Sequence, residues 1–219
     1  VWQSSSASSE GGSLVSYGLE LADGASNKFI RLANFNGLRF STFTTANVKL
    51  AYGEQWGDTV TVLVYTYQGD GDLAAIGLAE TLSAANRGEN FTVIFVNNGI
   101  YGMTGGQMAP TTLVGMKSTT TPGGRNPEEH GYPMHMSEII NQLTAPYYIE
   151  RVSCDTPQHV IKARNAIKKA FKYQLEGKGY SIVEIVTSCP TNWGLDPLKS
   201  LDFLREKMFA EYPLGVFRD

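Results

Sequence analysis

From Thr59 onward, apolar and polar positions follow the spacing of regular secondary structure. Residues 59–67 (TVTVLVYTY) are β-branched and aromatic, so they predict a buried strand that ends in the turn QGDGD. Residues 91–96 (FTVIFV) predict the next strand. Between them, apolar residues at helical spacing predict a helix over 73–86; these are Leu73, Ile76, Ala79 and Leu82.

A second unit of the same kind follows further along the chain. Residues 147–153 and 180–186 predict strands, and a helix is expected between them from Gln158 to Glu176. The apolar face of that helix is predicted to consist of Val160, Ala163, Ile167, Ala170 and Phe171. Two strand–helix–strand units predict an α/β fold, in which a mostly parallel sheet carries helices on both faces.

Composition narrows the class of protein. The chain has 219 residues, of which 42% are hydrophobic, and this suits one globular domain over 1–219. A net charge of -3 with dispersed basic residues gives no electrostatic footprint for nucleic acid. No apolar run is long enough for a membrane span, and two cysteines are too few for a disulfide framework, so we expect a cytoplasmic protein. The start, VWQSSSASSEGG, has neither an initiator Met nor signal-peptide features, and we expect the true start to be missing.

The loop after the first strand carries the first candidate chemistry. Gly69, Gly71 and Ala74 have the spacing of a dinucleotide-binding turn. However, Asp70 and Asp72 would repel a pyrophosphate in such a turn unless a cation lay between them. Magnesium prefers oxygen ligands and keeps phosphate oxygens as partners, so a metal-bridged diphosphate removes the conflict. Taken alone, these residues also fit an ordinary turn.

Asn97 and Asn98 follow the second strand, which in a parallel sheet ends at the same edge as the first. Gly69-Asp70-Gly71 followed by this Asn-Asn pair resembles the signature of thiamine-diphosphate enzymes. The resemblance implies that magnesium is bound by Asp70, Asn98 and the carbonyl of Ile100. It also implies that the loop 69–72 contacts the diphosphate. The alternative role for the two asparagines is to end a strand.

The Gly- and Pro-rich segment 97–133 is too long and irregular for a simple connection, and such loops commonly carry function. With YQGDGDLAAIGLAE, RGEN and CPTNWG, it resembles the β subunit of 2-oxoacid:ferredoxin oxidoreductases of the 2-oxoglutarate or 2-oxoisovalerate type. The resemblance runs from about Thr66 to Asp219. It implies cofactor contacts in YGMTGGQ, from Tyr101, Gly102, Met103 and Thr104. The alternative is a flexible surface loop with an ordinary buried Met.

The resemblance implies a reaction and its partners. The enzyme would oxidatively decarboxylate a 2-oxoacid to acyl-CoA and CO2, with electrons passing through a 4Fe-4S cluster to ferredoxin. The preferred substrates are 2-oxoglutarate and branched-chain 2-oxoacids. Thiamine diphosphate and Mg²⁺ would be the other cofactors, and an α subunit with further small subunits would complete the complex. We name no acid–base residue in this chain. The alternatives are a non-oxidative decarboxylase or carboligase and a cofactor-free structural subunit.

Cys189 opens CPTNWG, and the resemblance makes it one of four thiolate ligands to the cluster. The alternative is a small buried cysteine at a strand end. The other cysteines of the family pattern are absent from this sequence. Ser6 and Ser9 have the spacing of the family's early Cys-x-x-Cys pair, and Leu38 follows a glycine near the place of the family's later Gly-Cys. We hypothesise that residues 1–58 are wrongly or incompletely assigned; if they are correct, the chain has lost the cluster.

Overall fold

The computed structural model describes the backbone and side chains of residues 63–219. Before them it describes only secondary structure, in the ranges 2–4, 17–21, 30–33, 47–52 and 55–61. Contacts within the chain divide it into two compact units. One comprises Val1–Thr42 and Val48–Val62, and the other Phe43–Asn47 and Leu63–Asp219. The expectation of a single domain stays a prediction.

The described segments before residue 62 are all strands. Three of them form an antiparallel sheet in the order β1-β2-β3, and the other two form a two-stranded sheet. Their bounds are β1 Trp2–Ser4, β2 Tyr17–Leu21, β3 Ile30–Ala33, β4 Asn47–Tyr52 and β5 Gln55–Thr61. Ser6, Ser9 and Leu38, on which the expectation about missing cysteines depends, lie outside the described residues.

The larger unit is built on a five-stranded sheet in the order β12-β10-β11-β7-β6. The four strands β10, β11, β7 and β6 are parallel, and β12 joins the edge antiparallel to β10. The bounds are β6 Tyr65–Gly69, β7 Thr92–Asn97, β10 Tyr148–Ser153, β11 Ser181–Val186 and β12 Gly215–Arg218. This confirms the predicted α/β fold with a mostly parallel sheet.

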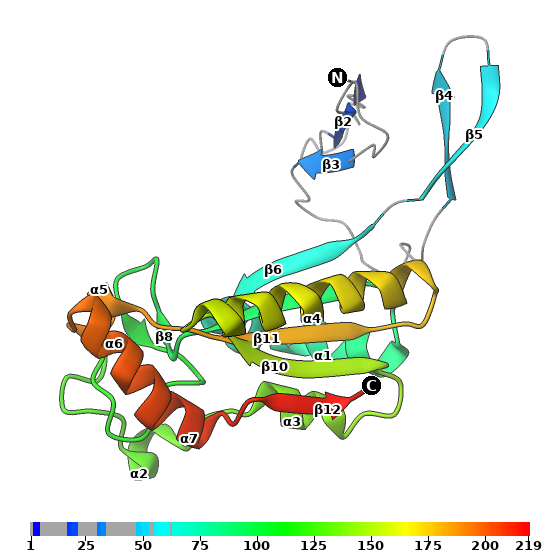
Figure 1. Ribbon diagram of the computed structural model, residues 1–219. Helices are drawn as coiled ribbons and strands as arrows, with labels where there is room; N and C mark the ends of the chain where they lie inside the picture. Colours follow the sequence, from blue (N-terminus) through cyan, green and yellow to red (C-terminus); the bar gives the residue numbers. More distant parts are fainter. Residues whose placement is uncertain (1, 5–16, 22–29, 34–46, 53–54, 62) are drawn as a thin grey trace. The chain divides into compact units, whose positions relative to one another are not determined.

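Helices cover both faces of this sheet, as predicted (Figure 1). On one face lies α4, Pro157–Leu175, whose small residues Ala163, Ala166 and Ala170 pack against β10 and β11. Its first turn is fixed by Thr156, whose hydroxyl accepts a hydrogen bond from the amide of His159. On the other face lie α1, Leu78–Arg87, and α3, Met136–Asn141, over a core that includes Phe95, Ile149 and Ile182.

The remaining elements are short and surround the carboxyl ends of the parallel strands (Figure 1). They are η2 Asp72–Ile76, β8 Ile100–Tyr101, β9 Gln107–Met108, α2 Pro127–His130, α5 Pro190–Trp193, α6 Pro197–Phe203, η3 Leu204–Met208 and α7 Phe209–Glu211. None of the helices in the described part of the chain has the length and apolar character needed to cross a bilayer.

The predicted helix over 73–86 is wrong in its register. The structure has a wide π-helical turn, η2, in which the amide of Gly77 donates to the carbonyl of Asp72 at 2.7 Å, and α1 follows it. The wide turn rotates the later residues, so Ile76, expected in the apolar face, is 78% exposed. Val160 was also expected to be buried, and it is about half exposed because the alanines of α4 take the place against the sheet.

The predicted buried strand over 59–67 is also corrected. Residues up to Thr61 belong to β5, and the strand that enters the sheet is β6, which lies beside β7 at the edge of the sheet as far as the described residues go. As an edge strand, β6 alternates between exposed and half-buried side chains, and Tyr67 is among the exposed ones. A β-branched run cannot by itself distinguish an edge strand from a central one.

A buried ionic cluster ties β10 and β11 to α3. Arg151 is fully buried, and its Nε lies 2.9 Å from Oε2 of Glu184, its neighbour in the parallel register. Its Nη1 and Nη2 donate to the two carboxylate oxygens of Glu138 at 2.8 and 2.5 Å. Glu184 also accepts hydrogen bonds from Asn97 and Ser137. Burial alone would raise the pKa of Glu138, but the hydrogen bonds and charge of Arg151 outweigh it and hold that pKa below its ordinary value.

We expect Arg151→Met to lower the free energy of unfolding by about 3–5 kcal/mol, because Glu184 would be left buried and unpaired. Arg151→Met combined with Glu184→Gln should recover part of this loss, since Gln removes the buried charge, keeps one oxygen as the acceptor for Asn97 and turns its NH2 to the hydroxyl of Ser137, which can accept. Urea unfolding measures both. Arg164→Met, on the exposed side of α4, is the control and should change stability by less than about 0.5 kcal/mol. Equal costs at the two arginines would contradict the assignment.

Candidate functional site

The carboxylate of Asp70 lies just beyond the carboxyl end of β6 and joins three separate segments. Its Oδ1 accepts from the amide of Gly71 at 3.0 Å, and its Oδ2 accepts from the amide of Ile100 and the hydroxyl of Thr111, both at 2.9 Å. Asp70 is only 3% exposed. Burial raises its pKa to about 6, although the hydrogen bonds from Thr111, Ile100 and Gly71 oppose the shift.

The two asparagines after β7 have different roles. Asn97 is buried. Its side-chain NH2 donates to Oε1 of Glu184 at 2.8 Å, and its Oδ1 accepts from the backbone amide of Gly99. Asn98 is half-buried, and its Oδ1 accepts from the amide of Ile100 at 3.2 Å. The same amide donates to Asp70, so oxygens of Asp70 and Asn98 meet at one point. The two side chains therefore lie close together, as parallel strands predict, while their binding of magnesium stays a prediction.

Gly71 is required by the ring of Tyr101. A Cβ at position 71 would lie 2.0 Å from Cε1 of Tyr101 and 2.4 Å from its Cδ1. The hydroxyl of Tyr101 points back to the carbonyl of Gly71 at 3.5 Å. Gly69, in contrast, has open space around its Cα, since nothing lies within 4 Å of a Cβ built there. The loop therefore needs a glycine at 71 for close packing and not at 69.

The short helix α5 closes the site from the side of Cys189. The amide of Asn192 donates to the carbonyl of Gly102 at 2.8 Å and to Sγ of Cys189 at 3.3 Å. The indole of Trp193 donates to the carbonyl of Asn98 at 3.1 Å. Gly102 itself lies against Cys189, because a Cβ there would be 3.4 Å from Sγ. CPTNWG thus holds both the Asn98 loop and YGMTGGQ.

Three predicted site residues are exposed and make none of the hydrogen bonds described above for the site. Asp72 is exposed, and its carboxylate accepts from the side chain of Gln68 at 3.1 Å. Thr104 is exposed, and its hydroxyl donates to the side chain of Gln107 at 2.7 Å. Met103 is 100% exposed, which is not the buried Met of the alternative interpretation. Their predicted contacts with the cofactor stay predictions.

The donor set around Asp70 suits a hard cation. A carboxylate, an amide oxygen and a backbone carbonyl are the ligand types that magnesium takes in proteins. Among the side chains of residues 63–219, no Lys, Arg or His forms an ion pair with Asp70, so a buried negative charge lacks a counter-charge there. A cation bound by Asp70, Asn98 and the Ile100 carbonyl would supply it.

A 4Fe-4S cluster does not fit the residues of this chain by themselves. Such a cluster takes four thiolates, and the sequence contains only Cys154 and Cys189. Both are free, and within the described residues no group of three or more His, Cys, Asp or Glu side chains could hold a metal ion. Cys189 supplies one thiol beside Gly102, and any other ligands must come from outside these 219 residues.

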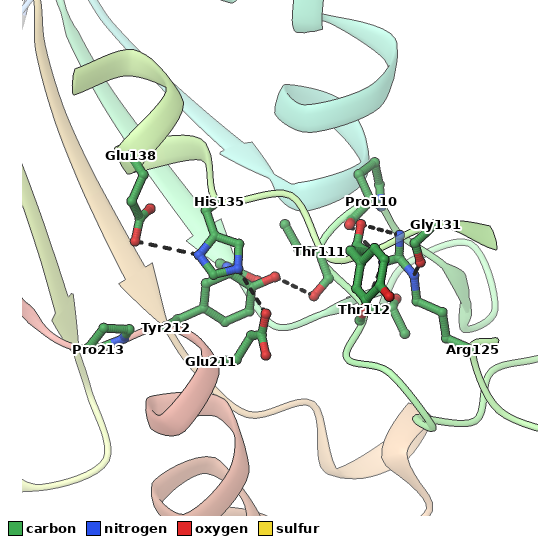
Figure 2. Close-up of polar contacts among 12 residues, drawn as sticks. Pro110, Thr111, Thr112, Arg125, Gly131, His135, Glu138, Glu211, Tyr212 and Pro213 are labelled. Carbon is green, nitrogen blue, oxygen red and sulfur yellow. Dashed lines mark hydrogen bonds and ion pairs between the residues drawn. The ribbon is translucent and has the colours of Figure 1, made fainter. Parts of the chain in front are cut away.

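The sequence prediction missed the residues that support this site. Figure 2 shows four of them, Thr111, Thr112 and Arg125 in the long loop and Tyr212 after α7. The other two are Asn192 and Trp193 in α5. Asn192 and Trp193 lie within CPTNWG, which pointed to the region but not to their roles. For Thr111 and Thr112 the only signal is a polar pair in a Gly- and Pro-rich segment.

Comparison with known proteins adds the family context. Residues 44–185 match the family described as "Thiamine pyrophosphate enzyme, C-terminal TPP binding domain". The match begins before Thr66, where the predicted resemblance starts, so likeness to the family extends further toward the N-terminus than the sequence motifs indicated.

Several curated proteins and solved structures are similar to the chain. Ketoisovalerate oxidoreductase subunit VorA of Methanothermobacter marburgensis is 50% identical over 186 residues, which are 81% of this chain and 38% of that protein. The 2-oxoglutarate synthase subunit KorB of the same organism is 37% identical over 68% of this chain and 49% of its own length. A structure of 2-oxoglutarate:ferredoxin oxidoreductase from Magnetococcus marinus, with 2-oxoglutarate, coenzyme A and succinyl-CoA bound, aligns with a TM-score of 0.51 and 26% identity, covering 69% of this chain and 54% of that one. The chain therefore spans half or less of the length of these two curated relatives.

We predict that Gly71→Ala lowers the free energy of unfolding of the cofactor-free protein by about 1–3 kcal/mol, because the new methyl group must displace Tyr101. Gly69→Ala, in the same loop, meets nothing and should cost less than about 0.5 kcal/mol. In the background of Tyr101→Ala, most of the cost of Gly71→Ala should disappear. Chemical unfolding of the four variants tests this, and a cost that is unchanged without the Tyr101 ring would refute it.

The raised pKa of Asp70 predicts a pH dependence for the metal-free protein. Because the folded-state pKa, about 6, lies above the ordinary value of 3.8, the stabilisation from a protonated Asp70 is fully present below about pH 3.8. It is lost as the pH rises through about 6. Relative to Asp70→Asn, the wild type should lose about 2 kcal/mol of stability between about pH 4.5 and 7, measured by urea unfolding with EDTA. A constant difference between the two proteins would count against the shift.

Proposed function

Because the chain belongs to the thiamine pyrophosphate enzymes, with their C-terminal TPP-binding domain at residues 44–185, we propose that it is the thiamine-diphosphate-binding subunit of a 2-oxoacid oxidoreductase. The reaction would convert a 2-oxoacid to acyl-CoA and CO2, with electrons leaving to ferredoxin. The observation that carries the proposal is the meeting of Asp70 and Asn98 at the amide of Ile100. This shared donor places the Asp70 carboxylate, whose Oδ1 accepts a single hydrogen bond, beside the amide oxygen of Asn98, and both groups are ligand types that magnesium takes.

Each loop at the carboxyl ends of β6 and β7 would contact a different part of the cofactor. Asp70, Asn98 and the carbonyl of Ile100 would hold Mg²⁺, and the backbone of residues 69–72 would face the diphosphate. Bound thiamine diphosphate would supply the electron sink for decarboxylation. Gly102, with Tyr101, Met103 and Thr104, would line the cofactor, while Asn192 holds the Gly102 carbonyl in place. No acid–base residue is assigned to this chain.

The path of the electrons needs ligands from elsewhere. Cys189 lies beside the loop assigned to the cofactor, so its thiolate could be one ligand of a 4Fe-4S cluster. Since the chain's only other cysteine is Cys154, the remaining ligands would come from outside the given residues. We therefore derive no step through the cluster from this chain.

The names of the similar proteins support a choice of substrate and partners. VorA is named for ketoisovalerate and KorB for 2-oxoglutarate, and both are subunits by name. We propose a branched-chain 2-oxoacid or 2-oxoglutarate as substrate, coenzyme A as acyl acceptor, and an α subunit with further small subunits as partners. Two free cysteines suit the reducing cytoplasm, where we place the protein.

The proposal predicts that the purified protein, with the subunits that accompany it, binds thiamine diphosphate in a magnesium-dependent way. Asp70→Ala should weaken this binding by at least about 100-fold, because it removes a metal ligand. Even the loss of a residue that only hydrogen-bonds to a ligand lowers metal affinity by about 10- to 100-fold. Asp202→Ala removes an exposed carboxylate from α6 and is the matched control, expected to leave binding unchanged.

Calorimetric titration with the cofactor at fixed magnesium measures these affinities, and iron and sulfide analysis completes the test. A wild type that binds no thiamine diphosphate would indicate the rival function, a cofactor-free structural subunit. Binding without iron in the complex, together with CO2 release in the absence of an electron acceptor, would indicate a non-oxidative decarboxylase or carboligase.

A further inference from the structure

Two adjacent threonines lie beneath the Asp70 carboxylate, and neither is explained by the sequence motifs. Thr111 and Thr112 follow β9 in the long loop, and both are fully buried. The hydroxyl of Thr111 donates to Oδ2 of Asp70 at 2.9 Å. The hydroxyl of Thr112 donates at 2.5 Å to the carbonyl of Gly99, in the loop between Asn98 and Ile100. Each threonine thus holds one half of the site.

The hydrogen bonds to Asp70 are unevenly divided between its two oxygens. Oδ2 accepts two, from the Ile100 amide and the Thr111 hydroxyl, whereas Oδ1 accepts one, from the Gly71 amide. A carboxylate oxygen offers about two lone-pair positions. Oδ2 is therefore filled by protein donors, and Oδ1 keeps a position for a cation.

The backbone that carries the threonines is fixed from two sides (Figure 2). The hydroxyl of Tyr212 donates to the carbonyl of Thr111 at 2.7 Å. The guanidinium of Arg125 donates to the carbonyls of Pro110 and Thr112 at 2.8 and 2.7 Å. Arg125 is buried, and it also donates to other backbone carbonyls of this loop, those of Ala109, His130, Gly131 and Tyr132. Its charge is used to order backbone, so the position of Thr111 is set independently of any cation.

We propose that Thr111 is a positioning residue for the magnesium–diphosphate site, whose hydroxyl closes Oδ2 of Asp70 and leaves Oδ1 as the oxygen that binds the metal. This inference rests on the proposed function. The carboxylate torsion of Asp is broad when no partner fixes it. Without the Thr111 hydroxyl, each oxygen of Asp70 would accept one backbone N–H, Oδ1 from Gly71 and Oδ2 from Ile100, so either oxygen would have a position for the metal and binding would have to select one.

The test compares side chains at position 111 that keep or lack the hydroxyl. Thr111→Val keeps the shape and removes the donor, while Thr111→Ser keeps the donor. The readout is the dissociation constant for Mg²⁺, titrated by calorimetry in the presence of excess thiamine diphosphate, on the protein with its accompanying subunits. Metal-free thermal stability is recorded for every variant, to separate loss of fold from loss of binding.

Thr111→Val should raise the Mg²⁺ dissociation constant by about 10- to 100-fold, and Thr111→Ser by no more than about threefold. Thr66→Val is the matched control. Thr66 lies in β6, and its hydroxyl has no hydrogen-bond partner within the described residues, so affinity should not change. If Thr111→Val does not fold, the pair Thr111→Ala and Thr111→Ser gives the same comparison, since they too differ by the hydroxyl.

Three results would overturn the inference. They are Thr111→Val binding Mg²⁺ as tightly as the wild type, Thr111→Ser losing as much affinity as Thr111→Val, and the Ala and Ser variants binding equally. In each of these the wild type still binds, so the proposed function stands. A wild type that binds neither Mg²⁺ nor thiamine diphosphate overturns the proposed function, and this inference with it.

Discussion

One buried carboxylate, that of Asp70, joins the segments from which the site is built. It receives hydrogen bonds from residues adjacent to it, thirty positions later and forty-one positions later in the chain. Parallel register makes this meeting possible, because β6 and β7 end at the same edge of the sheet. The long loop then returns under that edge and places Thr111 against the carboxylate. If Asp70 were removed, the amide of Ile100 and the hydroxyl of Thr111 would lose their common acceptor.

A second polar layer lies one residue further into the sheet. Asn97 precedes the site residue Asn98, and its side chain points the other way, to Glu184 in the ionic cluster of Arg151. Its Oδ1 also accepts from the amide of Gly99, which fixes the turn that presents Asn98. The Arg151 cluster therefore supports the site from below through one amide side chain. Tyr212 links the same two layers, because its ring lies under the Arg151 guanidinium and its hydroxyl holds Thr111.

How much of this could be predicted depends on the range of the interactions. The central strands could be predicted because β7 and β11 are buried on both faces and are mostly apolar, with Glu184 as the buried charged exception in β11. The closeness of Asp70 and Asn98 could be predicted because it follows from the parallel topology of β6 and β7. The π-helical turn at Asp72–Ile76 could not, since it leaves the same composition as an α-helical turn. Thr111 and Arg125 could not be predicted either, because an irregular loop places side chains by tertiary hydrogen bonds that have no period in the sequence.

The buried charged groups of the described residues differ in how their charge is compensated. Arg151 is balanced by two carboxylates, and Arg125 is solvated by backbone carbonyls, so the buried cations have partners. Asp70 is buried with hydrogen-bond donors but without an ion pair in the described part of the chain. A buried anion that keeps its donors but lacks a counter-charge favours any state in which a cation is added. A cation bound at Oδ1 would therefore stabilise the folded protein, so the free energies of cation binding and of folding would be coupled. The same loops that order the site would then become more stable when it is filled.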